Sequence, residues 1–357
     1  MVDSRHAKFA AMLTDYCVKI KKGDVVQLSF GFEAKELALE VYKRIVKKGA
    51  FPRAHADLPG FGYSFYKLAT DEQLKTFPKI TEFEAKNTDA WISIGTEYNT
   101  REFSNIDPKK LSLRQRTTKK ISDIVVGSDN WVICEYPTNA LAQEADMSLE
   151  EFEDFVYGAC LQDWFIEERR QKTLQKLMDK TNDVRILHKD TDIRFSIKGK
   201  KAVKCCGKRN MPDGEVFTEP VKNSINGFIT FTYPAIYNGR EVDGVRLEFR
   251  NGKVVKATAV KNQEFLNQML DTDAGSRFVG EFGVGVNYGI KKFIKNILFD
   301  EKIGGTVHLA LGKAYKETGG ENNSAVHWDM IKELRDGGQL FFDGKLVQKN
   351  GKFLFKM

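Results

Sequence analysis

The chain has little cysteine, proline and histidine for its 357 residues: five Cys, eight Pro and five His. No two cysteines have the C-x-x-C spacing, which disfavours both a zinc knuckle and a redox pair. We expect reduced, mostly buried thiols, because unpaired cysteine is among the most buried residue types. No apolar run approaches the roughly 20 residues that a membrane-spanning helix needs.

Several signatures of common enzyme classes are also missing. The chain has no G-K-[ST] phosphate loop, no G-x-S-x-G elbow and no H-E-x-x-H helix, which disfavours P-loop nucleotide binding, serine hydrolases and the commonest zinc proteases. Glycines 283, 285 and 289 are spaced G-x-G-x-x-x-G, which differs from the dinucleotide-binding G-x-G-x-x-G. The first residues lack the basic start and apolar core of a secretory signal, so we expect a cytoplasmic protein.

Composition favours a folded chain and does not by itself identify a partner. Hydrophobic residues make up 41% and charged residues 29%, which excludes a disordered or collagen-like chain. The net charge of +7 permits a basic partner surface but does not demand one. The segment 194–209 holds seven basic residues but only one aromatic, Phe195, so we expect a solvated hairpin rather than a nucleic-acid surface.

The first half of the chain predicts an α/β layer. A turn at residues 22–24 leads into an apolar strand ending near Phe30, and residues 34–48 have helical apolar spacing. Further strands are expected at 52–56 and 90–94. This alternation predicts an α/β N-terminal domain, residues 1–183, with a mainly parallel sheet. A capping box, Ser148 with Glu151, opens a helix expected to continue to about Lys180.

The second half predicts an α+β C-terminal domain, residues 184–357, with antiparallel strands that carry a metal site. Its short strands are separated by turn dipeptides that tolerate positive φ, as tight hairpins require. We expect helices near 262–270 and 288–298. The dipeptides are Asp213-Gly214, Asn238-Gly239, Asn251-Gly252, Asp343-Gly344 and Asn350-Gly351.

Two histidines are candidates for metal binding. In a strand, His327 and Asp329 would project from the same face, and zinc accepts both imidazole nitrogen and carboxylate oxygen. The tripeptide alone is equally consistent with an ordinary His–Asp pair on a solvated strand. His308, in the alternating segment 306–312, would point away from the core formed by Val307, Leu309 and Leu311. By itself it also fits a structural histidine.

Two glutamates stand out by their surroundings. Glu215 follows the turn at residues 210–214, and Glu281 lies among glycines that let a backbone approach another group closely. As isolated residues, both would be surface charges by default.

Taken together, these segments resemble one family. The chain contains, in order, NMPDGEVF at 210–217, GEFGVG at 280–285, FDEKIGGTVHLALG at 299–312 and SAVHWD at 324–329. These motifs closely resemble those of the thermophilic metallo-aminopeptidases of the aminopeptidase T and aminopeptidase S type. Residues 135–138, 145–148 and 190–193 are similar to further family segments.

The resemblance implies a cytoplasmic, homodimeric exopeptidase that holds two divalent metal ions and acts on peptides with a free N-terminus. It implies no nucleic-acid or membrane partner. The implied metal ligands are Glu215, Glu281, His308, His327 and Asp329. The implied catalytic residues are Glu281 as the shared ligand, Tyr315 as a further ligand or catalytic hydroxyl, and Glu301.

The chemistry of these residues agrees with that implication. Oxygen and nitrogen ligands suit two ions that activate a water and polarise the scissile carbonyl. A ligand set of two histidines and carboxylates does not choose among Zn²⁺, Co²⁺, Mn²⁺ and Mg²⁺. Two alternatives stay open at this stage: a two-metal phosphoesterase, and a basic binding protein with structural ions. The second is disfavoured because structural zinc sites prefer closed, cysteine-rich sets.

Overall fold

The computed structural model describes residues 3–237 and 239–357. Met1, Val2 and the Asn238 of the expected Asn238-Gly239 turn therefore lie outside the described residues. The chain forms two compact units. The first runs to Leu161 and takes in the segment Gly207–Pro212, and the second comprises Gln162–Cys206 and Asp213–Met357.

The first unit is built on a five-stranded parallel sheet in the order β2-β1-β3-β4-β8. The expected α/β layer with a mainly parallel sheet is confirmed. Its strands are β1 (Val25–Gly31), β2 (Phe51–Asp57), β3 (Ala90–Gly95), β4 (Trp131–Glu135) and β8 (Asn210–Met211). Its helices are α1 (Ser4–Ala11), α2 (Lys35–Lys47), α3 (Phe61–Leu68), α4 (Asp71–Lys75), α5 (Lys79–Lys86), α6 (Pro108–Gly127), α7 (Asn139–Glu144) and α8 (Leu149–Cys160).

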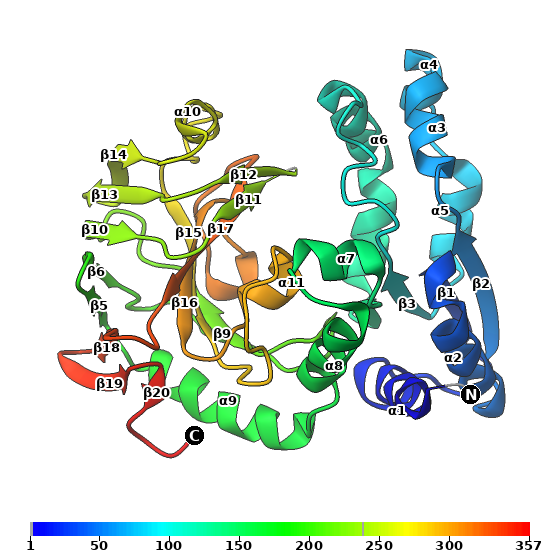
Figure 1. Ribbon diagram of the computed structural model, residues 1–357, viewed down its shortest axis with the longest axis horizontal. Helices are drawn as coiled ribbons and strands as arrows, with labels where there is room; N and C mark the ends of the chain where they lie inside the picture. The colour runs from blue at the N-terminus through cyan, green and yellow to red at the C-terminus, as the bar shows by residue number, and fades with distance from the viewer. Residues whose placement is uncertain (1–2, 238) are drawn as a thin grey trace. The chain divides into compact units, whose positions relative to one another are not determined.

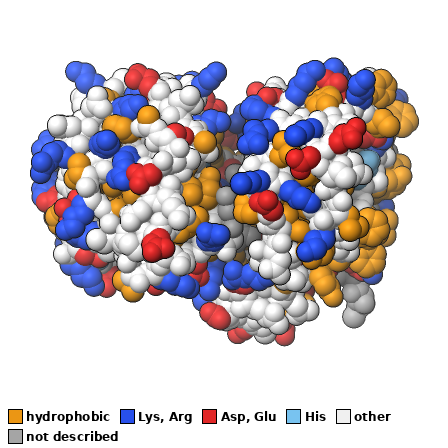
Figure 2. All heavy atoms as spheres, turned by 90° about the horizontal axis from the view of Figure 1, so that it is seen from above, with side chains coloured by type: hydrophobic (Ala, Val, Ile, Leu, Met, Phe, Trp, Pro, Cys, Tyr) orange, Lys and Arg blue, Asp and Glu red, His pale blue; other side chains and the backbone are white. Residues whose placement is uncertain are grey.

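This unit leaves many large apolar side chains exposed. Helix α2 buries one stripe, Leu37, Val41 and Ile45, at the spacing of a helix face. Strand β2 is an edge strand with no fully buried residue, and its Phe51 is 63% exposed. Figure 2 shows hydrophobic side chains gathered on the surface of this unit, on the right of the view.

The second unit consists mainly of antiparallel sheets (Figure 1). One has eight strands in the order β14-β13-β10-β6-β5-β18-β19-β20, and another has five in the order β17-β16-β15-β9-β7. Strands β11 (Ala235–Tyr237) and β12 (Arg240–Val242) pair separately. The eight-stranded sheet comprises β5 (Asp183–His188), β6 (Thr191–Ser196), β10 (Asn226–Thr230), β13 (Arg246–Arg250), β14 (Lys253–Thr258), β18 (Gln339–Phe342), β19 (Lys345–Lys349) and β20 (Lys352–Phe353).

The five-stranded antiparallel sheet comprises β7 (Val203–Cys205), β9 (Glu215–Thr218), β15 (Val279–Gly285), β16 (Thr306–Gly312) and β17 (His327–Glu333). Its apolar face packs into one core with the eight-stranded sheet, and the Phe195 and Phe282 rings meet edge to face at 5.0 Å. The burial of these apolar side chains stabilises the unit, because each Å² of apolar surface removed from water contributes about 25 cal/mol. One face of the sheet is thereby held in the core, which leaves the other face for polar groups.

The turn dipeptides behave as expected at three hairpins. Asn251, Asp343 and Asn350 all have positive φ near 50°, and the glycine after each also has positive φ. Each pair joins two antiparallel strands, β13 to β14, β18 to β19 and β19 to β20. The twist of such two-residue turns matches that of the strands they connect.

Two expected helices differ from the structure. The helix expected from Ser148 to about Lys180 begins with the Ser148–Glu151 capping box but ends at Cys160. A second helix, α9 (Trp164–Met178), then starts because the Asp163 carboxylate accepts hydrogen bonds from the Phe165 and Ile166 amides. The expected boundary after residue 183 follows α9, whereas the compact units divide before it.

The helix expected near 288–298 is mostly irregular. Only α11 (Ile297–Asp300) is helical, because Lys295 adopts positive φ and Asn296 caps the short helix after it. The helix expected near 262–270 is present as α10 (Gln263–Leu270). Within the described residues, none of the helices combines the length and apolar character needed to cross a membrane.

Candidate metal centre

The five expected ligands lie on one face of the five-stranded sheet β17-β16-β15-β9-β7. Glu281 of β15 pairs with Ala310 of β16, which in turn pairs with Asp329 of β17. Residues directly opposite each other in an antiparallel pair share a face, and so do residues two apart along a strand. The same face therefore carries His308, which pairs with Gly283, and Glu215, which pairs with Gly285. The opposite face holds Phe282, Val307 and Leu309 in the core.

The side chains of these residues meet in two groups that share Glu281. His308 Nε2 lies 3.2 Å from both Glu215 Oε2 and Glu281 Oε1. His327 Nε2 lies 3.6 Å from Glu281 Oε2 and 3.5 Å from Asp329 Oδ2. In each group of three, one ligand atom from each residue lies within 4.8 Å of the others. The structure thus brings together all five residues, which span positions 215 to 329 of the chain.

A glycine makes room for the imidazole of His308. A Cβ atom at Gly283 would lie 2.0 Å from His308 Nε2, well inside any real contact distance. The absence of a side chain at residue 283 lets the ring lie across strand β15 toward Glu215 and Glu281. Gly283 therefore serves the close approach of a side chain, whereas Gly280 and Gly285 leave room for the backbone carbonyl oxygens of Gly312 and Ile303.

The orientation of His327 is fixed by a backbone contact. Its Nδ1 lies 2.8 Å from the carbonyl oxygen of Lys313 and is placed to donate a hydrogen bond to it. That bond leaves the Nε2 lone pair directed toward Glu281 and Asp329. Metal-binding histidines commonly use one ring nitrogen in this way, with the other free for the ion.

The centre contains an excess of buried acidic groups. Burial, with Asp329 and Glu215 nearby, raises the pKa of Glu281. Although burial opposes it, Lys302 and His308 hold the pKa of Glu215 below its ordinary value. Burial by itself would lower the pKa values of His308 and His327. The neighbouring carboxylates, which favour the protonated imidazole, have the larger effect and raise both pKa values. Such a cluster attracts positive charge.

Glu301 and Tyr315 lie at the border of this cluster. Burial raises the pKa of Glu301 to about 8, and Glu215 and Asp329 act in the same direction. One Glu301 oxygen, Oε1, is bonded to the Lys302 ammonium. The Tyr315 ring meets the His327 ring at 5.1 Å and is 42% exposed. Burial raises the pKa of the Tyr315 phenol, and the carboxylates of Glu281 and Asp329 act in the same direction.

The residues present fit divalent metal ions. Asp329 Oδ1 is a buried atom that has no hydrogen-bond partner in the described chain. An unpaired buried polar atom is costly, and a cation would satisfy this carboxylate oxygen. The donor set of carboxylate oxygens and imidazole nitrogens suits zinc, cobalt or manganese.

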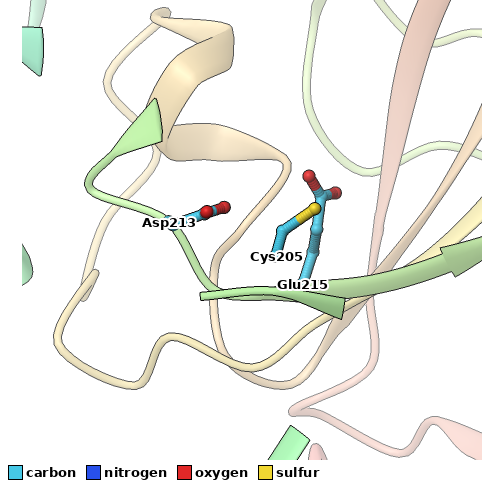
Figure 3. Close-up of side chains that lie close together, drawn as sticks. All are labelled: Cys205, Asp213 and Glu215. Carbon is cyan, nitrogen blue, oxygen red and sulfur yellow. The ribbon is translucent and has the colours of Figure 1, made fainter. Parts of the chain in front are cut away.

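Three further residues belong to this region although sequence reasoning did not select them. Lys302 is fully buried, and its Nζ lies 3.8 Å from Glu215 Oε1. Cys205 and Asp213 form a third group with Glu215, as Figure 3 shows. Asp213 lies before strand β9, which begins at Glu215, and Gly214 between them has positive φ, so strand alternation did not mark it. No sequence signal marks the burial of Lys302.

Known aminopeptidases are similar to this chain over nearly its whole length. Aminopeptidase 2 of Geobacillus stearothermophilus is 27% identical over 398 positions, which cover 97% of this chain and 94% of that protein. Aminopeptidase AmpS of Bacillus subtilis is 25% identical and covers 97% and 98%. The solved structure of wild-type AmpT from Thermus thermophilus has the same fold, with a TM-score of 0.88 over 99% of this chain and 100% of that one, at 19% identity.

The family model for the thermophilic metalloproteases matches residues 2–353. The resemblance drawn from the four motifs is therefore confirmed, and the fold expected from it is confirmed by the AmpT structure. The chain belongs to the M29 family of thermophilic metalloproteases.

Proposed function

We propose that the chain removes N-terminal residues from peptides, using two divalent ions held by Glu215, Glu281, His308, His327 and Asp329. The coarser statement, a metallo-aminopeptidase, follows from membership in the family and from relatives that bear that name. The observation that carries the finer proposal is the pair of three-residue groups that share Glu281.

The division of the ligands follows from these groups. Glu215, Glu281 and His308 would hold one ion, and Glu281, His327 and Asp329 the other. When bound, two such ions supply Lewis acidity that strengthens water as a nucleophile near neutral pH and polarises the peptide carbonyl. The two carboxylate oxygens of Glu281 point to different histidines, which suits a ligand shared between ions.

Glu301 is the candidate proton acceptor. It is not among the residues of the two ligand groups, and its pKa of about 8 suits a group that takes and returns a proton near neutral pH. Its Oε1 is held by Lys302, so the proton would be carried by Oε2. The protonated Tyr315 hydroxyl would donate a hydrogen bond to the oxygen that becomes negative in the transition state.

The test uses aminoacyl-arylamides after chelation and re-addition of single metal ions. We expect activity only with metal, and none against the same substrates after N-acetylation. Aryl phosphates in parallel reactions address the phosphoesterase alternative. His327→Gln should abolish activity, whereas His55→Gln, at an exposed position on strand β2, is the matched control and should not.

Efficient cleavage of N-acetylated peptides, or hydrolysis by the chelated protein, would refute the proposal. A homodimer in the cytoplasm is part of the same proposal, and light scattering at micromolar concentration measures the mass. A monomeric mass would refute the homodimer and would leave the proposed activity unaffected.

A further inference from the structure

The loop of residues 313–326 joins strand β16 to strand β17 and carries Tyr315. We call it the Tyr315 loop. Its base is closed by a hydrogen bond of 2.6 Å from the Lys313 amide to the Val326 carbonyl oxygen. Beyond this base, the Tyr315 ring meets the His327 ring at 5.1 Å. The place of the Tyr315 hydroxyl therefore depends on how the loop is held.

Local bonds fold Tyr315 into a turn. Its carbonyl oxygen accepts hydrogen bonds from the Thr318 hydroxyl at 2.7 Å and from the Gly320 amide at 3.1 Å. A Cβ atom at Gly320 would lie 2.4 Å from the same oxygen, so this position needs glycine. All of these partners lie within the loop. They shape the turn, and other contacts must attach it to the sheet.

A buried carboxylate supplies one such attachment. Glu219 directly follows strand β9, and its side chain is fully buried. Its Oε1 accepts hydrogen bonds from the amides of Glu321 at 3.2 Å and Asn322 at 3.3 Å. Strand β9 begins at Glu215, one of the five residues of the candidate centre. Glu219 thus ties the Tyr315 loop to the strand that carries this residue.

A buried lysine completes the attachment. Lys200 Nζ lies 3.0 Å from Glu219 Oε2 and donates to the Gly319 carbonyl oxygen at 2.8 Å. The Lys200 side chain is only 9% exposed. Burying two charges costs solvation free energy, which the pair recovers only through close contact and further hydrogen bonds. Here those further bonds all go to one loop, so the pair fixes the loop relative to the sheet.

The end of the loop that leads to His327 is held separately. The Asp273 carboxylate accepts hydrogen bonds from the Ser324 hydroxyl at 3.0 Å and from the Ala325 amide at 2.7 Å. The His327 ring also keeps its own bond to a backbone carbonyl oxygen. Removing Glu219 should therefore release the turn around Tyr315 and leave His327 in place.

We propose that Glu219 is a positioning residue that, with Lys200, holds the Tyr315 hydroxyl beside the metal centre. This inference rests on the proposed function, in which that hydroxyl donates a hydrogen bond in the transition state. Misplacing such a group by 1 Å typically lowers the rate about 100-fold. We expect Glu219→Ala to lower kcat by about that factor, with KM changed less than roughly threefold, because the lost bond forms only in the transition state.

A double-mutant cycle separates positioning from general damage. In a Tyr315→Phe background, Glu219→Ala should lower kcat by less than about threefold, because the hydroxyl that it positions is absent. Glu219→Gln keeps one oxygen for the two loop amides and should recover at least roughly tenfold of the lost kcat. Glu321→Ala is the matched control. Its carboxylate lies 3.5 Å from Lys200 Nζ but is 75% exposed, so kcat should stay at the wild-type value.

Metal content and stability are measured on the same proteins. Glu219→Ala should bind as many ions as wild type, since His327 is held separately. An unchanged kcat in Glu219→Ala, an equal loss in both backgrounds, a loss of bound ions, or no recovery in Glu219→Gln would overturn the proposal. If Glu219→Ala does not fold, Lys200→Met enters the same cycle. It should lower kcat roughly tenfold with Tyr315 present and leave it unchanged with Phe at that position.

Hydrogen exchange tests the attachment without any assay of activity. Peptides covering residues 318–323 should exchange faster in Glu219→Ala than in wild type, and at the wild-type rate in Glu321→Ala. Unchanged exchange in Glu219→Ala would overturn the proposal. Faster exchange in a chain that hydrolyses no peptide under any ion would support the attachment of the loop while refuting the proposed function. Wild-type hydrolysis that Glu219→Ala leaves intact would refute the positioning role alone.

Discussion

Replacing Gly283 by alanine tests whether a missing side chain creates the space for His308. The new Cβ would lie 2.0 Å from His308 Nε2 and 2.1 Å from Cε1. Ordinary contacts begin near 3.4 Å, so the imidazole would have to retreat by about 1.4 Å. His308 is fully buried. Its strand β16 is paired with β15 on one side and with β17 on the other, so the ring has little room to move.

The expected cost follows from that displacement. Misplacing a catalytic group by 1 Å typically lowers the rate about 100-fold, which corresponds to about 2.7 kcal/mol of transition-state stabilisation. Overpacking in a close-packed interior costs roughly 1–3 kcal/mol of folding free energy. We therefore expect Gly283→Ala to lose about 100-fold in kcat/KM, to bind less than two ions per chain and to unfold more easily.

The assay combines arylamide hydrolysis, metal content and denaturant unfolding in a double-mutant cycle. If the clash is with the His308 ring, Gly283→Ala should cost little stability in a His308→Ala background. Gly158→Ala is the control, since a Cβ there meets nothing within 4 Å and its helix should tolerate alanine. Gly283→Ala protein with two bound ions and unchanged kcat/KM would refute this account, as would an equal loss of stability in both backgrounds.

Three further outcomes are expected. Glu281→Gln should leave less than one ion per chain by elemental analysis. Without metal, this variant should be no less stable than metal-free wild type, because Asp329 and Glu215 repel the carboxylate that the substitution removes. Tyr315→Phe should lower kcat/KM by roughly 100-fold, with an unchanged melting temperature, because the ring contact with His327 remains. Asp273 has a pKa of about 2: burial would raise it, but bonds from Ala325 and Ser324 lower it. Its stabilisation is therefore present above pH 3.8 and is lost as the pH falls through about 2. Asp273→Asn should thus be less stable than wild type by about 1–3 kcal/mol at pH 7, with the difference shrinking in acid unfolding curves.

Local patterns in the sequence predicted much of the second unit. Strand β16 begins at Thr306 and ends at Gly312, the limits of its alternating segment, because Val307, Leu309 and Leu311 share the core face. The turns Asn251-Gly252, Asp343-Gly344 and Asn350-Gly351 were equally local, since only their two residues need positive φ. Asp213-Gly214 was wrongly expected to be such a turn, because the strands on either side of it belong to different sheets. The same alternation also put His308 on the polar face before any tertiary contact was considered.

What the sequence could not predict depends on contacts between distant segments. Cys205 and Glu215 become neighbours only through the pairing of β7 with β9, although Gly207–Pro212 between them belongs to the other unit. Lys302 is a residue type that is usually exposed, and its burial follows from charges on other strands. The break after Cys160 was missed because the helical apolar pattern continued past Asp163, whose capping role outweighed it.

The central claim is that five residues of one sheet face hold two ions. Its most direct test is anomalous X-ray diffraction from crystals of the Mn²⁺-loaded chain. The account predicts two manganese peaks roughly 3.5–4 Å apart, with the Glu281 carboxylate between them. One peak should contact Glu215 and His308, and the other His327 and Asp329. A single peak within this cluster, or manganese bound only elsewhere on the chain, would contradict it.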